Sequence, residues 1–515
     1  MLVKVNGSAV FGVDALPIII EVNWMNTGKD SMIVGLPDNA VKESLQRIES
    51  AFKTNNYKMP RTKVVINLAP ADIKKSGTAF DLPMAIGILA ATEQIQNAEL
   101  LQQYVIMGEL SLDGEIRPIK GALPISIQAR KQGFKGLFVP LQNVREAAIV
   151  NNINVYGISH INELIDFINH NEQGIQPTLI NTREEFYDAQ YEFENDFADV
   201  KGQENIKRAF EIVAAGGHNA ILIGPPGAGK TMLAKRLPSI LPPLSLQEAL
   251  ETTKIHSIAG KLPENATLIA KRPFRSPHHT ISDVALVGGG GMPQPGEISL
   301  AHNGVLFLDE LPEFKRTVLE VMRQPMEERK VTISRAKVAL DFPANFMLIA
   351  SMNPCPCGYY NHPEKECSCP PGAVQKYLNK ISGPLLDRID LHVEVTPVPF
   401  SQLSNTKKEI SSAEIRDRVS AARAMQEKRF ENMSGIYSNA QMDSKLLKEI
   451  CVIDSVGQHL LKTAMEKLNL SARAYDRILK VSRTIADLHQ SEKIKAEYLA
   501  EAIQYRSLDR ESWAG

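Results

Sequence analysis

A glycine-rich octapeptide near the middle of the chain has the composition of a phosphate-binding loop. An apolar run at 220–223 precedes it and helix-forming residues at 232–236 follow, so the order is strand, loop and helix. In such a loop the backbone N–H groups bind phosphate, the lysine reaches the β and γ oxygens, and the threonine hydroxyl binds Mg²⁺. A glycine-rich turn with an accidental lysine is the alternative, which this context disfavours. The octapeptide, predicted to bind ATP and magnesium, consists of Gly224, Pro225, Pro226, Gly227, Ala228, Gly229, Lys230 and Thr231.

Two carboxylates follow a second apolar run. Residues 305–308 are apolar, and Asp309 and Glu310 come directly after them. In a nucleotide hydrolase the first carboxylate of such a pair holds magnesium and the second polarises the attacking water. A surface acidic pair is the alternative. The position of the two carboxylates, about eighty residues after the octapeptide, favours a hydrolytic site.

Three more polar residues could complete this site, and the residues alone leave two interpretations of each. Asn353 ends an apolar run, where it could orient the water or cap the strand. Arg388 could receive the phosphate held by a neighbouring subunit, or pair with Asp387 or Asp390. Arg473 begins a predicted helix and could either cover the nucleotide or point into solvent.

Four of the five cysteines gather in one short segment. They form two Cys-x-Cys pairs separated by nine residues, and four thiolates from two turns suit a structural zinc ion. The pairs are tighter than the common Cys-x-x-Cys spacing, so four reduced thiols are the alternative. The four cysteines are Cys355, Cys357, Cys367 and Cys369.

Composition bounds the class of protein. With 515 residues the chain is too long to fold around one hydrophobic core. Its apolar content of 43% and charged content of 23% are typical of globular proteins. The net charge of −1 gives no general attraction to nucleic acid, so any DNA contact requires a local basic patch. No apolar run approaches about eighteen residues and the first residues are unlike a signal peptide. We therefore expect a cytoplasmic protein with no membrane partner.

The pattern of elements predicts an α/β protein with three domains. Short β-like runs alternate with helical stretches in residues 1–170 and again in 200–396. The intervening segment, 171–199, is strongly acidic and reads as a linker, with a solvated charged helix as the alternative. Residues 397–515 are helical in pattern.

The ordered set of motifs resembles the AAA+ ATPases. The segment 295–304 resembles the magnesium-chelatase/MCM branch of these ATPases. Nearly the whole chain resembles the ComM/YifB family, most specifically at 271–279, 353–358 and 382–391. The resemblance implies a ring, usually a homo-hexamer, with nucleotide at the subunit interfaces. It also implies the roles of sensor 1, arginine finger and sensor 2 for Asn353, Arg388 and Arg473.

A basic segment lies between Asp309 and Asn353. Its two β-rich runs predict a hairpin, and in the related ring ATPases a hairpin at this place, before sensor 1, projects into the central pore. A ring would repeat its cations and so build a channel for DNA phosphates, to which Arg272 and Arg275 could add. An exposed hairpin with solvated charges is the alternative. The candidate DNA-binding residues are Arg329, Lys330, Arg335 and Lys337.

The amino-terminal domain resembles the proteolytic domain of Lon at 76–83 and 114–119. That family uses a serine–lysine dyad, and here Thr78 stands at the serine position and Leu123 at the lysine position. Because the general base is absent, we expect a proteolytically inactive domain that serves ring assembly or contacts with DNA or a partner. A weak nucleophile at Thr78, with Lys120 three residues before the dyad position as the substitute base, is the alternative.

Taken together, the sequence predicts a Lon-like α/β domain, an AAA+ core with a hairpin and a zinc-binding insertion, and a helical lid. The resemblance implies an ATP-driven motor on single-stranded or branched DNA that promotes branch migration when transforming DNA is integrated, with recombination proteins among its partners. A chelatase-type motor that remodels a partner protein is the first alternative. An ATP-dependent Lon-like protease is the second.

Overall fold

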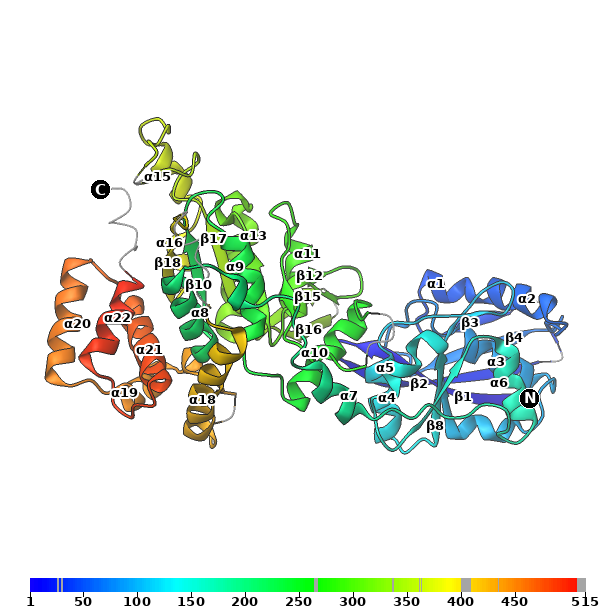
Figure 1. The fold of residues 1–515 in the computed structure, drawn as a ribbon. Coiled ribbons are helices and arrows are strands. Elements are labelled where there is room, and N and C mark those ends of the chain that lie inside the picture. The colour runs from blue at the N-terminus through cyan, green and yellow to red at the C-terminus, as the bar shows by residue number, and fades with distance from the viewer. Residues whose placement is uncertain are drawn as a thin grey trace. The chain divides into compact units, whose positions relative to one another are not determined.

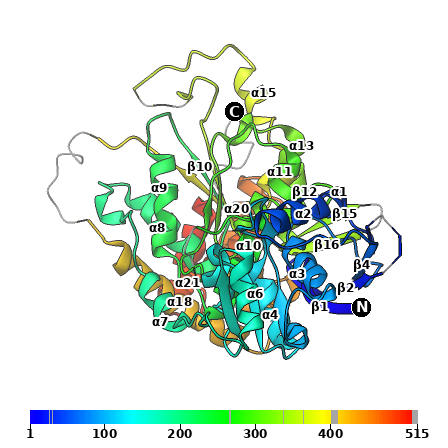
Figure 2. The ribbon, with the colours of Figure 1, turned by 90° about the vertical axis from the view of Figure 1, so that its right-hand side faces the viewer.

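Residues Met1–Asp188 and Leu246–Ile269 fold together as one unit, and Ala189–Ser245 and Ala270–Gly515 as another. The structure is a computed structural model, in which each unit has a β-sheet of its own (Figures 1 and 2). The structure describes all residues except 26, 29–30, 264–266, 336–337, 361, 363, 400–408, 434 and 507–515, and it does not describe the side chains of residues 335 and 338.

A seven-stranded mixed sheet forms the first unit, in the order β3-β4-β2-β1-β5-β8-β9. The long strands β1 and β2 form an antiparallel hairpin, while β5, β8 and β9 continue the sheet in parallel. A small hairpin, Glu109–Leu110 with Ile116–Arg117, stands apart from this sheet. The seven strands are β1 (Leu2–Phe11), β2 (Asp14–Trp24), β3 (Met32–Val34), β4 (Val64–Ala69), β5 (Tyr104–Ile106), β8 (Gly136–Pro140) and β9 (Asn154–Ile158).

Helix α3 (Asp81–Ala91) is buried at every residue and packs on β1 and β2. Its sequence is apolar on all sides, as expected for a helix that is enclosed by its own domain. Its only charged residue, Asp81, accepts hydrogen bonds from Ser44 and Arg47. The other helices of this unit are α1 (Asn39–Lys42), α2 (Ser44–Thr54), α4 (Ala122–Lys131), α5 (Val144–Ala147), α6 (Ile161–Asn169), α7 (Thr182–Ala189) and α10 (Leu246–Ala259).

Helix α10 belongs to the first unit although it follows the glycine-rich octapeptide in the sequence. The expected second domain, 200–396, is therefore interrupted at 246–269. Helix α10 packs on α4, and the buried Ser257 hydroxyl donates to the buried Glu146 carboxylate. These tertiary contacts, which the periodicity of α10 alone does not specify, assign it to the first unit.

The second unit contains a parallel five-stranded sheet in the order β11-β14-β17-β10-β18. The octapeptide follows β10 at its carboxyl end, and β14 and β17 carry the carboxylates and Asn353 at the same edge. All residues of β10, β14 and β17 are buried, as expected for central strands of a parallel sheet. The strands are β10 (Ala220–Ile223), β11 (Phe274–Arg275), β14 (Val305–Leu308), β17 (Met347–Met352) and β18 (Leu391–Glu394).

Two small hairpins accompany this sheet. One pairs β12 (Gly288–Gly289) with β13 (Gln294–Pro295), and the other pairs β15 (Lys330–Arg335) with β16 (Val338–Pro343). The second is the hairpin expected from the basic segment. The helices of this part are α8 (Glu204–Gly216), α9 (Lys230–Arg236), α11 (Asp283–Val287), α12 (Glu297–Leu300), α13 (Arg316–Val321), α14 (Arg323–Glu328), α15 (Ala373–Leu378) and α16 (Gly383–Leu386).

The carboxyl-terminal region is helical, as its sequence predicts. Side-chain caps begin several of these helices, including a capping box between Ser411 and Glu414 and a cap by Ser471. Helix α8 packs against α18 and α21, so this region shares a hydrophobic core with the parallel sheet (Figures 1 and 2). The helices are α18 (Ser412–Phe430), α19 (Ser444–Ile450), α20 (Ser455–Lys467), α21 (Ala472–Leu488) and α22 (Ala496–Gln504).

The expected acidic linker is partly folded. It contains α7 and a short 3₁₀ turn, Phe197–Asp199, and both Phe186 and Phe197 are buried. Burial of these two aromatic side chains stabilises folded structure in a segment whose many acidic residues predicted a linker. In the described part of the chain, no helix is both long and apolar enough to span a membrane.

Candidate nucleotide-binding site

Lys230 is buried at the start of α9, directly after the glycine-rich loop. Its Nζ atom donates to the carbonyls of Gly224 and Pro225, at 2.7 and 2.9 Å, and to Oδ1 of Asn353, at 3.1 Å. Burial lowers the pKa of the lysine, against the attraction of Asp309 and Glu310. The structure therefore brings together the lysine and the asparagine that follow separate apolar runs in the sequence.

The shape of the loop depends on its glycines. Gly227 and Gly229 have φ angles of +78° and +85°, in the left-handed region that side chains disfavour. A Cβ atom at Gly224 would lie 2.1 Å from the carbonyl oxygen of Val395. The loop thus passes close to the chain after β18. Its glycines allow the compact turn in which backbone N–H groups can bind phosphate.

Thr231 and Asp309 meet at the edge of the sheet. The threonine hydroxyl donates to Oδ2 of Asp309 over 2.6 Å, and the Ser351 hydroxyl donates to Oδ1 of the same carboxylate. The two candidate magnesium ligands are therefore adjacent. Ser351 is a further residue of the site that local sequence does not indicate, since its only signal is its position near the end of β17, two residues before Asn353.

Glu310 has a left-handed backbone, with φ +53° and ψ +51°. Its N–H group donates to Asp309 Oδ1 and to Ser351 Oγ, which hold this uncommon conformation. The side chain is 57% exposed, and its Oε2 atom lies 3.7 Å from Nδ1 of His279. The carboxylate is thus accessible to water, as a residue that polarises a nucleophile must be.

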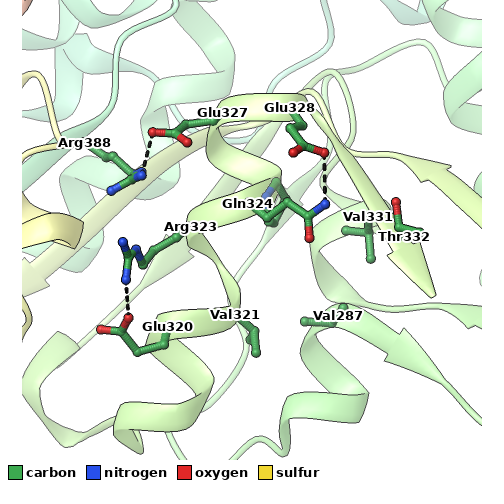
Figure 3. A pocket seen from close by; sticks show the side chains of 11 residues that line it. Val287, Glu320, Val321, Arg323, Gln324, Glu327, Glu328, Val331, Thr332 and Arg388 are labelled. Atoms are coloured by element: carbon green, nitrogen blue, oxygen red, sulfur yellow. Dashed lines mark hydrogen bonds and ion pairs between the residues drawn. The ribbon is translucent and has the colours of Figure 1, made fainter. Parts of the chain in front are cut away.

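Arg388 is almost completely buried, beside a cavity of about 500 Å³ (Figure 3). One NH group contacts Glu327 at 2.6 Å and another donates to the Pro384 carbonyl at 2.6 Å. Figure 3 shows a second ion pair in this cavity, between Arg323 and Glu320. Of the two interpretations of Arg388, ion pairing is therefore present, but the partner is Glu327 and not Asp387 or Asp390.

Arg473 lies in the first turn of α21 and is largely exposed. Its guanidinium is 3.6 Å from Asp387, the neighbour of Arg388 in the chain. The accessible position is compatible with both interpretations of this residue.

The four clustered cysteines come together. Their sulfur atoms all lie within 4.8 Å of one another, and the closest pairs are 3.3 to 3.7 Å apart. Zinc–sulfur bonds of about 2.3 Å in a tetrahedron would separate the sulfurs by about 3.8 Å. The N–H groups of Gly358 and Tyr360 donate to the sulfur of Cys355. The donor set and its spacing thus fit a structural zinc ion.

The base of the β15–β16 hairpin is tied to the domain. Arg329 is half-buried and donates to Asn345, and desolvation of its guanidinium lowers its pKa to about 10. Lys330 is exposed and pairs with Asp341 across the hairpin at 2.9 Å. Lys337 lies outside the described residues, as does the side chain of Arg335.

The other two candidate DNA cations have internal partners. Arg272 donates to the carbonyls of Pro242 and Asn303, and Arg275 forms two hydrogen bonds with Glu297, at 2.6 and 2.7 Å. These contacts hold β11 and the residues just before it to the rest of the unit. As with Arg329, the charge of these residues suggested a surface role that their position does not favour.

In the first unit, the Thr78 hydroxyl donates to Glu109. Leu123, at the expected lysine position, is buried, and its N–H group donates to Glu146 at 2.9 Å. Lys120 packs beside Gly260, on the segment after α10. The threonine hydroxyl is thus paired with the carboxylate of Glu109. This partner is not the lysine amine that a serine–lysine dyad uses as its base.

Comparisons with known proteins agree with this arrangement. Three family models match: "Magnesium chelatase, subunit ChlI" at residues 196–403, "Subunit ChlI of Mg-chelatase" at 20–143, and "Magnesium chelatase, subunit ChlI C-terminal" at 409–506. The match at 20–143 connects the first unit to the same family.

Several relatives are similar to this chain over nearly their whole length. Competence protein ComM of Haemophilus influenzae is 43% identical, covering 99% of this chain and 98% of the relative. The uncharacterized protein YifB of Escherichia coli is also 43% identical, covering 98% and 97%. Lon protease 2 of Bacillus subtilis is 31% identical over only 27% of this chain and 26% of its own, so the Lon likeness is partial. The chain belongs to the ComM/YifB family of magnesium-chelatase-like AAA+ proteins.

Proposed function

We propose that the protein is an ATP-hydrolysing ring motor that acts on DNA. The observation that supports the ATPase most directly is the meeting of Lys230 with Asn353 and of Thr231 with Asp309 at one edge of the parallel sheet. Nucleotide phosphates would replace the Gly224 and Pro225 carbonyls as acceptors for the lysine.

The remaining polar residues have defined tasks in this proposal. Thr231 and Asp309 would hold magnesium, which neutralises charge on the phosphates. Glu310 would accept a proton from the attacking water, and Asn353 would orient that water or the terminal phosphate. Arg473 would approach the nucleotide from the lid.

Arg388 would act on the nucleotide of the neighbouring protomer, as the family resemblance implies. Hydrolysis should then depend on protein concentration, because the arginine must arrive from another chain. Zinc bound by the four cysteines would stabilise the loop after β17 without taking part in the reaction.

The DNA part of the proposal rests on the family and on the β15–β16 hairpin. Lys330, Arg335 and Lys337 would contribute a basic ring when the subunit is repeated in a homo-hexamer, and such a ring attracts phosphates despite the neutral chain. The resemblance to a competence protein extends the proposal to branch migration of transforming DNA, together with recombination proteins.

The test measures ATP hydrolysis without DNA, with single-stranded DNA and with a branched junction. We expect DNA to stimulate hydrolysis in the wild type, whereas Lys230→Ala should be inactive under all conditions. Arg335→Ala with Lys337→Ala should weaken DNA binding and flatten its salt dependence, in contrast to Lys462→Ala on an exposed helix face. Hydrolysis that is indifferent to both DNAs would reject the DNA motor.

A chelatase-type motor that remodels a partner protein is the second candidate, because all three family models describe a magnesium chelatase subunit. It uses the same ATPase site, and DNA-independent hydrolysis would favour it. The pairing of Thr78 with Glu109 and the leucine at position 123 argue against a Lon-like protease. Peptide turnover that disappears with Thr78→Ala would reinstate that activity.

A further inference from the structure

The cysteine cluster begins directly beside the nucleotide site. Cys355 is two residues after Asn353, whose side chain accepts a hydrogen bond from Lys230 at 3.1 Å. Pro354 is the only residue between them, and its ring fixes one of the two backbone torsions. A displacement of Cys355 is therefore transmitted to Asn353 over at most about 7 Å of chain.

A second connection runs from the cluster to the phosphate-binding loop itself. Gly358 has a φ angle of +86°, and a Cβ atom there would lie 2.4 Å from Cδ of Pro226. The N–H group of the same glycine donates to the Cys355 sulfur at 3.2 Å. The turn from Cys355 to Gly358 thus has the cysteine sulfurs on one side and the phosphate-binding loop on the other.

The second pair of sulfurs closes this turn from a distance in the chain. Cys367 lies 3.7 Å from Cys355 and 3.5 Å from Cys357, sulfur to sulfur. A metal that joins the two pairs would close the intervening loop and remove most of its conformational freedom. Without a metal, the hydrogen bonds that the N–H groups of Gly358 and Tyr360 donate to Cys355 remain in this turn, and neither of them joins the two cysteine pairs.

The geometry points to the cysteine cluster as a clamp on the nucleotide site. Metal bound by the four sulfurs holds Gly358 against Pro226 and fixes Asn353 beside Lys230, so the metal content of the cluster sets the affinity for nucleotide. This inference rests on the proposed function, because it takes the loop at 224–231 as the nucleotide site and the cysteines as zinc ligands.

Two glycine variants separate the clamp from a general backbone effect. Gly358→Ala and Gly372→Ala both place a side chain at a positive φ, +86° and +77°, but no heavy atom lies within 4 Å of the Cβ position at Gly372. We expect Gly358→Ala to retain about one zinc ion per chain and to bind a fluorescent ADP analogue at least about tenfold more weakly. Gly372→Ala should bind it like the wild type. Equal affinities of the two variants would overturn the clamp.

Removal of the metal tests the same inference on the wild type. A zinc-selective chelator in excess magnesium should weaken binding of the ADP analogue by a similar factor, and added zinc should restore it. If the metal-free protein retains its circular dichroism spectrum and binds the analogue unchanged, or if the purified protein holds no zinc, the clamp is wrong. If instead the zinc-loaded wild type fails to bind the analogue, or Lys230→Ala binds it equally well, the proposed nucleotide site itself is wrong.

Discussion

The guanidinium of Arg388 lies 2.6 Å from the carboxylate of Glu327, in a cavity that α14 and β15 help to line (Figure 3). Arg388 is 6% exposed, whereas the Glu327 side chain is 53% exposed. An arginine that serves a neighbouring subunit has to leave this partner. The ion pair with Glu327 therefore opposes the movement of Arg388 toward the nucleotide of a neighbouring protomer in the proposed ring.

The first prediction concerns this ion pair. Glu327→Gln should release Arg388 and raise ATP hydrolysis at protein concentrations too low for full assembly. Because Glu327 is half-exposed, the pair contributes about 0–1 kcal/mol, so the increase should be up to about fivefold. The measurement is specific activity as a function of protein concentration.

Glu328→Gln is the matched control for Glu327→Gln. Glu328 lines the same cavity but accepts a hydrogen bond from Gln324. Its variant should follow the wild-type concentration curve. If Glu327→Gln lowers activity at every concentration, the carboxylate orients Arg388 and does not restrain it.

The second prediction concerns Ser351, which touches both carboxylate residues of the site. Ser351→Ala removes the donor to Asp309 and the acceptor for the Glu310 N–H group. We expect kcat to fall by about tenfold or more with little change in nucleotide affinity, because the loss affects the geometry of the reacting groups. Steady-state ATPase assays and equilibrium binding distinguish the two effects.

Ser299→Ala provides the comparison for a buried serine. The Ser299 hydroxyl is buried and has no hydrogen-bond partner among the described residues, so its loss should leave the ATPase unchanged. A Ser351→Ala enzyme with wild-type kcat would mean that Asp309 and Glu310 keep their positions without this hydroxyl.

Local sequence predicted that the candidate site residues would come together, because they follow strands whose carboxyl ends must meet. The apolar runs before Lys230, Asp309 and Asn353 become neighbouring parallel strands, and the sheet then brings the side chains together. Ser351 was not recognised, since a small hydroxyl inside an apolar run gives no distinct signal.

Contacts between segments that are distant in the chain could not be predicted from local sequence patterns. Nothing near Glu327 indicates its pairing with Arg388, which lies sixty-one positions later. Arg329 was expected at the surface because it is charged, yet it is half-buried and donates a hydrogen bond to Asn345. Helix α10 likewise joins the first unit through contacts with α4 that its own pattern does not encode.

The third prediction concerns Lys480 on α21. Burial and the nearby charge of Arg477 lower the pKa of this lysine to about 8. Between pH 8 and about 10.5 the unfolded chain therefore binds more protons, and the stability contributed by this group rises with pH. Lys480→Met should increase the free energy of unfolding by about 1–3 kcal/mol at pH 7.

Melting temperatures at pH 7 and pH 10 check this prediction. The advantage of Lys480→Met should shrink at pH 10, where the wild-type lysine is neutral in the folded protein. Lys462→Met, on a side chain that is 74% exposed, should show no such pH dependence. A stability difference that is constant with pH would indicate that packing, and not charge, separates Lys480→Met from the wild type.

The last prediction concerns the attachment of α10 to the first unit. The Ser257 hydroxyl donates to Glu146, a carboxylate that also accepts from the N–H group of Leu123 and from Asn143. Burial raises the pKa of Glu146, against these hydrogen bonds. Ser257→Ala should destabilise the unit by about 1–3 kcal/mol, because a buried charge loses one of its donors.

A double-mutant cycle with Glu146→Gln tests whether this cost depends on the charge. The amide keeps an oxygen for the Leu123 N–H group but has no negative charge to satisfy, so Ser257→Ala should cost less in that background. Hydrogen exchange of the α10 amides and thermal unfolding both measure the effect. Equal costs in the two backgrounds would show that Ser257 supports α10 through packing alone, and the attachment would then not depend on the buried carboxylate.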